Sequence, residues 1–453
     1  MSDAKKRNRS GAMLYRKKRR TCGLAFLVWT HLQTCSMAAD VNLHMMLESA
    51  SEHSFSLKSV YSDIGIEKAR LDSVRSDYYP TLAVSYNNEY NKGLGGMGVE
   101  SVGDTVISNG TGYQTSLALN FSYELYHFGM TRRKVNAAEK EVAVKQLQWC
   151  EEEIKLHREI LEHYAGALKA DVSLAEQQKM LEIRRRIYEQ KERLNAAGKY
   201  SKLDLGEEAI AILDLEHDAE ESGLRYDNEI MTLEKLSHLK LIKNDTLQPL
   251  RPEADESRPK VLFERTAEGA RVEEQLLQKH EEIIMLDRSR LPSIVFYGNY
   301  YFYGSDPTDV GNANESLRGS SWKAGVGIRW TIFEGFKFDS EMQRLKMERQ
   351  KLENERDALK RRYDYERQMG HARIKHYEML QTKEKGAISQ TEQRVGMAKR
   401  LRDQSEIKSI DVLLLDLEHV KRRLTLETKT IESDYEKILL NMTNKGSDQC
   451  ILR

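Results

Sequence analysis

The chain has 453 residues, of which 31% are charged and only 6 are proline. This composition favours long solvated helices over a compact, loop-rich fold. Two of the four cysteines, Cys22 and Cys35, lie close to the N-terminus, and the other two are 300 residues apart, so no disulfide framework is predicted.

Residues 1–39 have the three parts of a secretory signal peptide. A basic region at 16–20 precedes an apolar core at 23–29, which is shorter than the roughly 20 residues that a bilayer span needs. The segment holds nine Lys or Arg and one Asp, so the mature chain keeps 62 basic and 70 acidic side chains, a net charge of −8. A mildly acidic chain gives no reason to expect nucleic-acid binding. Lipidation at Cys35 is the alternative form of processing.

The rest of the sequence contains no transmembrane helix and no catalytic constellation. No run of about 18 apolar residues follows the signal, so an exported chain of this kind is either soluble or a β-barrel. His371 and His376 are five residues apart, off the i, i+4 face that helical metal pairs use. We therefore predict no enzymatic activity, no cofactor and no metal site.

The sequence repeats itself in two halves. The segment at 79–82 (YPTL) recurs at 291–294 (LPSI), and the segment at 203–205 (LDL) recurs at 410–412 (IDV). The first pair is offset by 212 residues and the second by 207, and the difference falls in glycine-bearing loops between them. The sequence therefore predicts a signal at 1–39, a first structural repeat at 40–250, a linker at 251–260, a second structural repeat at 261–445 and a tail at 446–453.

Each repeat is predicted to contain the same elements in the same order. The expected elements are a helical segment (about 42–77; about 260–289), two strands with a loop (about 79–127; about 292–334), a very long helix (about 131–197; about 338–404) and a shorter helix (about 204–240; about 410–442). A helix of 67 residues spans about 100 Å. Apolar residues recur along it at heptad-like spacing, as at Val135, Ala138, Val142 and Trp149.

The second and fourth strands alternate apolar and polar residues over more than ten positions. Their length suits a tilted membrane strand of about 9–11 residues, and aromatic residues suit the bilayer interfaces. A soluble β-sandwich is the alternative, although four strands without other β structure would make a poor one. The side chains predicted to face lipid are Leu117, Leu119, Phe121, Tyr123, Trp322, Val326, Ile328 and Trp330.

Four strands cannot close a barrel alone, because open edges are not tolerated in lipid and about 8 strands is the small end for closed barrels. The chain must therefore pool its strands with copies of itself. Two copies would supply about 8 strands and three about 12, and the pattern does not choose between them. A periplasmic coiled-coil rod is an alternative, but it does not explain why both halves insert a strand pair at the same place.

Residues 42–442 resemble the TolC-like outer-membrane efflux protein family. Three features carry this resemblance through their order, which is duplicated in the chain. They are the helix end and strand start at 75–82, the strand-to-helix turn at 125–129 and 332–335, and the helical hairpin turn at 197–204. The resemblance implies an α+β membrane protein: a homotrimer with a transmembrane β-barrel of four strands per chain and a coiled-coil α-helical barrel in the periplasm. It also implies a passive exit duct in the outer membrane that meets a periplasmic adaptor (a membrane fusion protein) and an inner-membrane transporter, for efflux or type I secretion. A standalone porin is the alternative that keeps the barrel.

The resemblance also assigns site residues near the hairpin tips. Adaptor contacts map to Gly198, Lys199, Tyr200, Ser201, Ser405, Glu406, Ile407 and Ser409. The carboxylates that close the periplasmic entrance map to Asp204 and Asp411, with Asp416 and Lys408 close by. The family's second entrance carboxylate, its basic partner and its aromatic partner fall instead at Leu414, Ile407 and Arg402. For each Asp, capping of the next helix is the alternative role.

Overall fold

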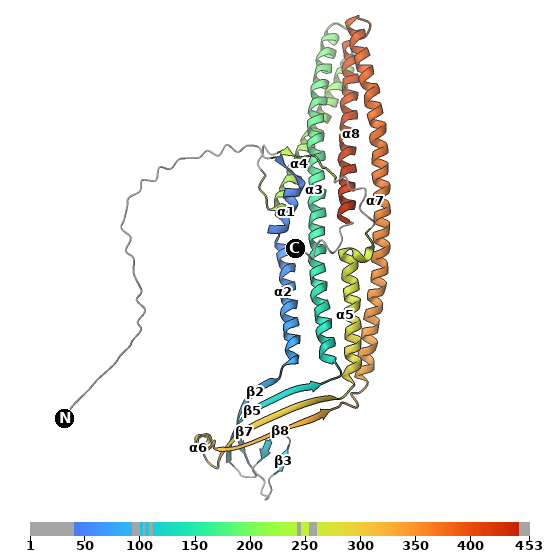
Figure 1. Ribbon diagram of the computed structural model, residues 1–453. Helices are drawn as coiled ribbons and strands as arrows, with labels where there is room; N and C mark the ends of the chain where they lie inside the picture. Colours follow the sequence, from blue (N-terminus) through green and yellow to red (C-terminus); the bar gives the residue numbers. More distant parts are fainter. Residues whose placement is uncertain are drawn as a thin grey trace, which may run out of the picture.

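The computed structural model describes residues 40–92, 100–102, 105–107, 112–241, 246–252 and 261–443. The molecule is elongated, with a β-sheet at one end and two helical hairpins at the other (Figure 1). The predicted signal with Cys35, residues 253–260 of the predicted linker and the tail at 446–453 lie outside the described residues.

The large elements follow the predicted order in both halves. In the first half they are α1 (Leu43–His53), α2 (Phe55–Arg75), β2 (Thr81–Asn91), β5 (Gly112–Tyr126), α3 (Met130–Ala196) and α4 (Lys202–Ser237). In the second half they are α5 (Ala267–Ser289), β7 (Ser293–Asp306), β8 (Gly319–Arg329), α7 (Lys337–Asp403) and α8 (Ser409–Thr443). The two longest helices, α3 and α7, both have 67 residues. Their first residues are 207 positions apart, which is the offset found in the sequence.

Several small elements differ from the prediction. The helix expected at 42–77 is broken at Ser54, whose hydroxyl oxygen accepts a bond from the Leu57 N–H at 3.5 Å and so caps a second helix. The loop expected between the two strands of the second half, within about 292–334, contains a short helix. The additional elements are β1 (Asp40–Val41), η1 (Ser76–Tyr78), β3 (Glu100–Val102), β4 (Thr105–Ile107), β6 (Thr246–Leu247), η2 (Phe263–Arg265) and α6 (Val310–Glu315).

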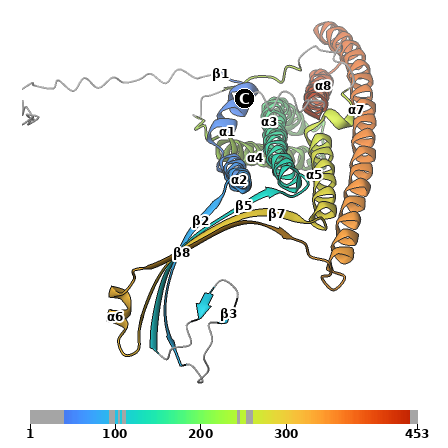
Figure 2. The same ribbon diagram turned by 60° about the horizontal axis from the view of Figure 1, so that its bottom comes forward.

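The four long strands form one antiparallel sheet in the order β2-β5-β7-β8, which bends away from the helices (Figure 2). The two halves meet where β5 pairs with β7. Among the described strands, β2 and β8 each lack a partner on their outer edge. The register aligns Val84, Leu119, Tyr300 and Trp322 across the four strands, so their side chains share one face.

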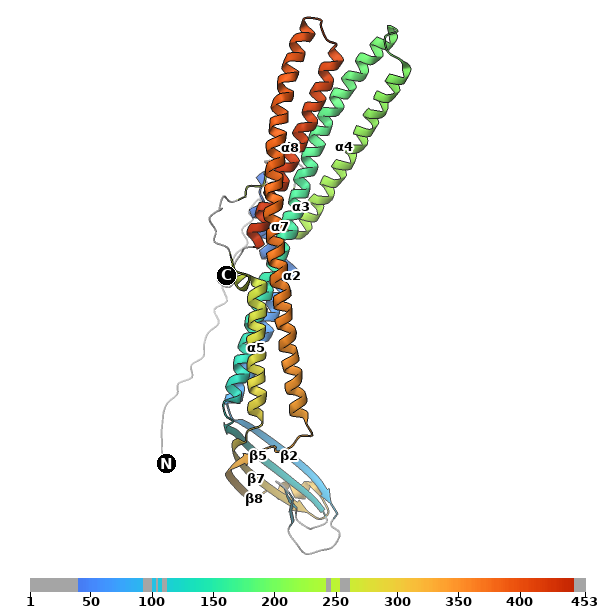
Figure 3. The same ribbon diagram turned by 90° about the vertical axis from the view of Figure 1, so that its right-hand side faces the viewer.

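The helices are arranged around α3. It packs against α2, α4, α5 and α8 and buries 18 residues, whereas α7 packs on α5 and α8 and buries five. Figure 3 shows the α3–α4 and α7–α8 hairpins side by side, with their turns at the end far from the sheet. No helix in the described part of the chain combines the length and the apolar character that a membrane crossing needs. Only five of the 67 residues of α7 are buried within the described chain, so most of the surface of this helix is exposed.

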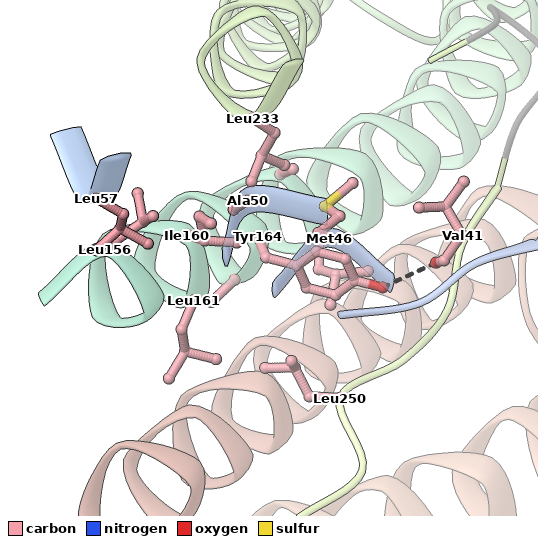
Figure 4. Packing of buried hydrophobic residues seen from close by; sticks show 13 residues of the cluster. Val41, Met46, Ala50, Leu57, Leu156, Ile160, Leu161, Tyr164, Leu233 and Leu250 are labelled. Carbon is pink, nitrogen blue, oxygen red and sulfur yellow. Dashed lines mark hydrogen bonds between the residues drawn. The ribbon is translucent and has the colours of Figure 1, made fainter. Parts of the chain in front are cut away.

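The main hydrophobic core lies at mid-height, where α1, α3, α4 and the segment after β6 meet (Figure 4). Tyr164 of α3 is fully buried there. Its hydroxyl donates to the carbonyl oxygens of Val41, at 3.1 Å, and Gln248, at 2.7 Å. It thereby fixes the parallel β1–β6 pair to the long helix. A second cluster contains Val135 and Val142, two positions of the heptad-like stripe predicted from the sequence.

Candidate functional site

The first candidate site is the apolar face of the sheet, which is also its more exposed face. On β8, Trp322 and Ile328 are both 74% exposed and Val326 is 62% exposed. The residues between them, including Lys323, are half-buried on the opposite face. A water-soluble sheet buries its apolar face and exposes its polar one. This inverted pattern indicates a surface that faces something other than water.

The predicted lipid-facing side chains occupy this face with one exception. Leu117, Leu119, Phe121 and Tyr123 alternate along β5, and Trp322, Val326 and Ile328 share their side of β8 through the register of β7. Trp330 lies just beyond the last residue of β8, not in the strand, and its indole N–H donates to the Arg290 carbonyl oxygen at 3.0 Å. The prediction set the end of the fourth strand too late, because the apolar alternation continues past the last strand hydrogen bond.

The opposite face of the sheet is polar and lines a cleft of about 630 Å³. Asparagine and serine side chains bind one another across three strands on this face. Asn299 donates to the Asn120 side-chain oxygen at 2.6 Å, and Asn120 donates to the Ser85 hydroxyl at 3.3 Å. The sheet thus separates an apolar surface from a hydrogen-bonded polar one.

The two turns that lead from the sheet into α3 and α7 have the same backbone shape. Phe128 and Gly129 have φ values of 48° and 74°, and Gly335 and Phe336 have 62° and 64°. The left-handed region is costly for a residue with a Cβ, so each turn places one Phe under strain. The turn predicted at 332–335 therefore extends to Phe336. The sequence did not indicate this, because the glycine is the second left-handed residue in the first turn and the first in the second turn.

The second candidate site is formed by the hairpin tips. In the first tip Gly198 has φ +71°, and the N–H groups of Gly198 and Lys199 donate to carbonyl oxygens in the last turn of α3. Ser201 then caps α4, because its hydroxyl accepts the Asp204 N–H at 3.1 Å and its own N–H donates to the Asp204 carboxylate at 3.0 Å. The Asn195 amide donates to the Tyr200 carbonyl oxygen at 2.6 Å. Local bonds therefore define the shape of this tip.

The second tip has the same design with different residues. Ser405 takes the left-handed position with φ 64°, and the N–H groups of Ser405 and Glu406 donate to carbonyl oxygens at the end of α7. Lys408 stands where the first tip has its capping serine, and its ammonium lies 5.8 Å from the centroid of the Tyr200 ring. Gln190 of α3 donates to the Ser409 hydroxyl at 3.4 Å. These contacts bring the two predicted tips together.

Exchanging residue types at the left-handed position is expected to change the stability of each tip. Ser405→Gly should stabilise the second tip by about 0.5–1 kcal/mol, because relief of the left-handed strain exceeds the entropy that glycine adds to the unfolded chain. Gly198→Ala should destabilise the first tip for the same reason. Amide hydrogen exchange at the ends of α7 and α3 should slow in the first variant and quicken in the second. Unchanged exchange in both would contradict this.

The predicted gate residues have unequal surroundings. The hydroxyl and backbone N–H of Ser201 donate to the Asp204 carboxylate and hold its pKa below the usual value, so this carboxylate belongs to the capping box of α4. Asp416 lies 3.5 Å from Lys399. Asp411 is exposed, and the structure gives its carboxylate no hydrogen bond or ion pair within the described ranges. Of the three predicted gate carboxylates, Asp411 is thus the one that makes no hydrogen bond or ion pair with the described residues.

A buried ion cluster supports the α3–α4 hairpin below its tip. The Glu208 carboxylate, 4% exposed, accepts from Arg184 at 2.7 Å and from Lys191 at 2.8 Å. Burial acts to raise the pKa of Glu208, but the bonds from Lys191 and Arg184 outweigh it and hold the pKa below the usual value. Sequence reasoning missed this cluster because its members are 24 and 17 residues from Glu208 and meet only when the hairpin forms.

This cluster predicts an acid-sensitive hairpin. Because the folded pKa of Glu208 is lowered, its contribution is present above the ordinary glutamate pKa of 4.5 and is lost as the pH falls through the folded value. At pH 7 the melting temperature of wild type should be higher than that of Glu208→Gln. The difference between the two melting temperatures should disappear as the pH falls below 4.5. Glu207→Gln, at the exposed neighbouring position, is the control. A difference in melting temperature that does not change with pH would exclude this role of the Glu208 carboxylate.

Comparison of the sequence with known proteins gives two results. The family model described as "Outer membrane efflux protein" matches residues 46–236. No curated protein has a sequence that matches this chain. The predicted resemblance to TolC-like outer-membrane efflux proteins is therefore confirmed by the sequence of the first half.

Solved structures of outer-membrane channels share the fold across both halves. The outer membrane protein VceC of Vibrio cholerae has a TM-score of 0.74 at 15% identity, over 89% of this chain and 96% of its own. The open state of the MtrE outer membrane channel of Neisseria gonorrhoeae has a TM-score of 0.72 at 16% identity, over 89% of each chain. The Campylobacter jejuni CmeC outer membrane channel has a TM-score of 0.72 at 14% identity, over 89% and 85%. At these identities the likeness concerns the fold.

Proposed function

Because the chain carries the sequence signature of outer-membrane efflux proteins over residues 46–236 and their fold over most of its length, we propose that it is an outer-membrane channel. Its sheet lies in the membrane and its helices extend into the periplasm. The channel is a passive conduit, and the energy for transport comes from a partner. The observation that carries the proposal is the sheet whose apolar face is the exposed one.

The outer edges of β2 and β8 support assembly from copies of the chain. Backbone groups on these edges need hydrogen-bond partners in lipid, and another copy can supply them. We propose a homotrimer, in which the β8 edge of one chain pairs with the β2 edge of the next. The largely exposed surface of α7 in the described chain supports the same assembly, because a neighbouring copy can cover it.

We propose that the tips dock a periplasmic adaptor, which links the channel to an inner-membrane transporter in an efflux or type I secretion system. The contacts of Lys408 with Tyr200 and of Gln190 with Ser409 support a shared docking surface, because they join the tips of both hairpins. We assign the entrance carboxylate to Asp411, whose copies around a threefold axis would form a ring of negative charge. Asp204 serves mainly as a cap.

Membrane fractionation of the mature protein tests the channel. We expect it in the outer-membrane fraction, extracted only by detergent, with a detergent-corrected mass of three chains that falls to one on heating. A stable monomer in detergent-free buffer would refute the channel and favour a periplasmic coiled-coil protein.

Photo-crosslinking tests the docking separately. A crosslinking residue placed at Lys199 or Glu406 should capture a protein that mass spectrometry identifies as a periplasmic adaptor. The same residue at Tyr61, which is exposed on α2 far from the tips, should not. A protein that assembles in the outer membrane and captures no adaptor from either tip would be a standalone porin.

A further inference from the structure

A row of tyrosine rings follows β7 on the polar face of the sheet. Tyr297, Tyr301 and Tyr303 all line the cleft on this face. The rings of Tyr301 and Tyr303 stack with their centroids 5.8 Å apart and their planes at 16°. From the first tyrosine to the last, six residues of strand cover about 20 Å. The face thus offers an extended aromatic surface.

Glycines in the neighbouring strand keep the first of these rings accessible. A Cβ at Gly325 would fall 2.9 Å from the Tyr297 hydroxyl oxygen, and one at Gly327 would fall 3.5 Å from a ring carbon. The ring therefore lies across two positions of β8 that have no side chains. Tyr297 is itself 39% exposed, so a solute in the cleft can reach it.

The same cleft is lined by cations and by no carboxylate from the described residues. Lys323 and Arg329 of β8 line it, and the Lys323 ammonium lies 5.9 Å from the centroid of the Tyr301 ring. Glu89 and Glu124 share this face by register but stand near strand ends, outside the lining. Among the described residues the charge of the lining is therefore positive, and this charge lies beside the rings.

We propose that this face is a contact track for planar aromatic anions, of which aromatic carboxylates are the simplest. A ring can stack on the tyrosines while its carboxylate binds Lys323 or Arg329. The inference rests on the proposed function, because the polar face becomes the wall of a duct only when copies of the chain close the sheet. Transit requires contacts that are weak and repeated along the path, and a row of rings on each copy provides them.

Saturation-transfer NMR on the purified, detergent-solubilised assembly tests the track, with salicylate as the probe. Salicylamide, a neutral compound of nearly the same shape, tests the need for charge, and cyclohexanecarboxylate tests the need for the ring. We expect transfer to the salicylate ring protons at least threefold above that to salicylamide, and little transfer to cyclohexanecarboxylate. This method detects millimolar binding, the range expected for a transit contact.

Variants on the two faces of the sheet locate the contact. Lys323→Gln combined with Arg329→Gln should reduce the salicylate signal at least threefold, and Tyr301→Leu should reduce it similarly. Lys323→Arg with native Arg329 keeps the charge and should keep the signal. Tyr300→Leu, on the opposite face of the same strand, is the matched control and should leave the signal unchanged.

The outcomes separate this inference from the proposed function. A detergent-requiring trimer that gives equal transfer to salicylate and salicylamide, or whose signal survives loss of both cations, would overturn the track and leave the channel intact. A detergent-free monomer would overturn the channel and the track together. Each variant is first checked for trimer mass, so a lost signal from an assembled trimer reports on the cleft and not on folding.

Discussion

Leu119→Arg is expected to abolish assembly of the chain in the outer membrane. Leu119 lies in the middle of β5 on the apolar face and is 42% exposed. An arginine on the lipid side near the bilayer midplane costs about 2–4 kcal/mol per chain, and a trimer would incur it in each copy. The heat-modifiable oligomer in the outer-membrane fraction should fall at least tenfold, as measured by unheated gel electrophoresis and immunoblotting.

Ser116→Arg is the matched control for that variant. Ser116 is on the same strand but lines the polar cleft, so the new charge would meet water and not lipid. We expect near-normal amounts of oligomer. Equal loss in both variants would mean that the strand tolerates no arginine for packing reasons. Normal assembly of Leu119→Arg would show that the apolar face does not lie against lipid.

Tyr164→Ala is expected to lower the free energy of unfolding by about 3–5 kcal/mol, the usual range for removing a buried aromatic ring. The ring fills the centre of the main core, and its hydroxyl binds the carbonyl oxygens of Val41 and Gln248. Burial raises the pKa of Tyr164, so the hydroxyl is protonated and can donate at neutral pH. Tyr164→Phe keeps the ring and should cost about 1–2 kcal/mol.

Urea unfolding of the detergent-solubilised protein, followed by circular dichroism, measures both losses. Tyr61→Ala is the control, because this residue is 66% exposed on α2 and should change stability by less than about 0.5 kcal/mol. The essential result is that the loss of unfolding free energy is largest for Tyr164→Ala, smaller for Tyr164→Phe and smallest for Tyr61→Ala. If Tyr164→Ala unfolds with the midpoint of wild type, the ring does not hold the β1–β6 pair to α3.

The parts of the fold that rest on local periodicity were predictable. The alternation in β5 and the heptad-like stripe through Val135 and Val142 each depend on residues close in sequence. The offset of 207 located α7 once α3 was recognised, although α7 itself has few buried residues. Turn chemistry is also local: the left-handed Gly198 and the capping Ser201 both fall within the hairpin turn predicted at 197–204.

The parts that depend on distant contacts were not predictable. Nothing near Ser54 in the sequence marks a helix break more strongly than many other serines do. The roles of Asp204 and Asp411 cannot be read from two matched positions. Ser201 pairs with Asp204 in a capping box, whereas Lys408 stands three residues before Asp411, whose carboxylate has no hydrogen bond or ion pair from the described residues. Likewise, the tyrosine row on β7 gained meaning only when the register placed Lys323 beside it.

The equal length of α3 and α7 restricts how such a molecule can change in evolution. One residue inserted in a single helix would turn everything beyond it by about 100° and raise its tip by about 1.5 Å, leaving one hairpin out of phase with its neighbour. Only insertions that keep the apolar stripes of the packed helices aligned, and that occur in all of these helices together, would leave the hairpin tips at the same height. We therefore expect the length of the helical part to vary among proteins of this fold in shared steps of seven residues, each about 10 Å.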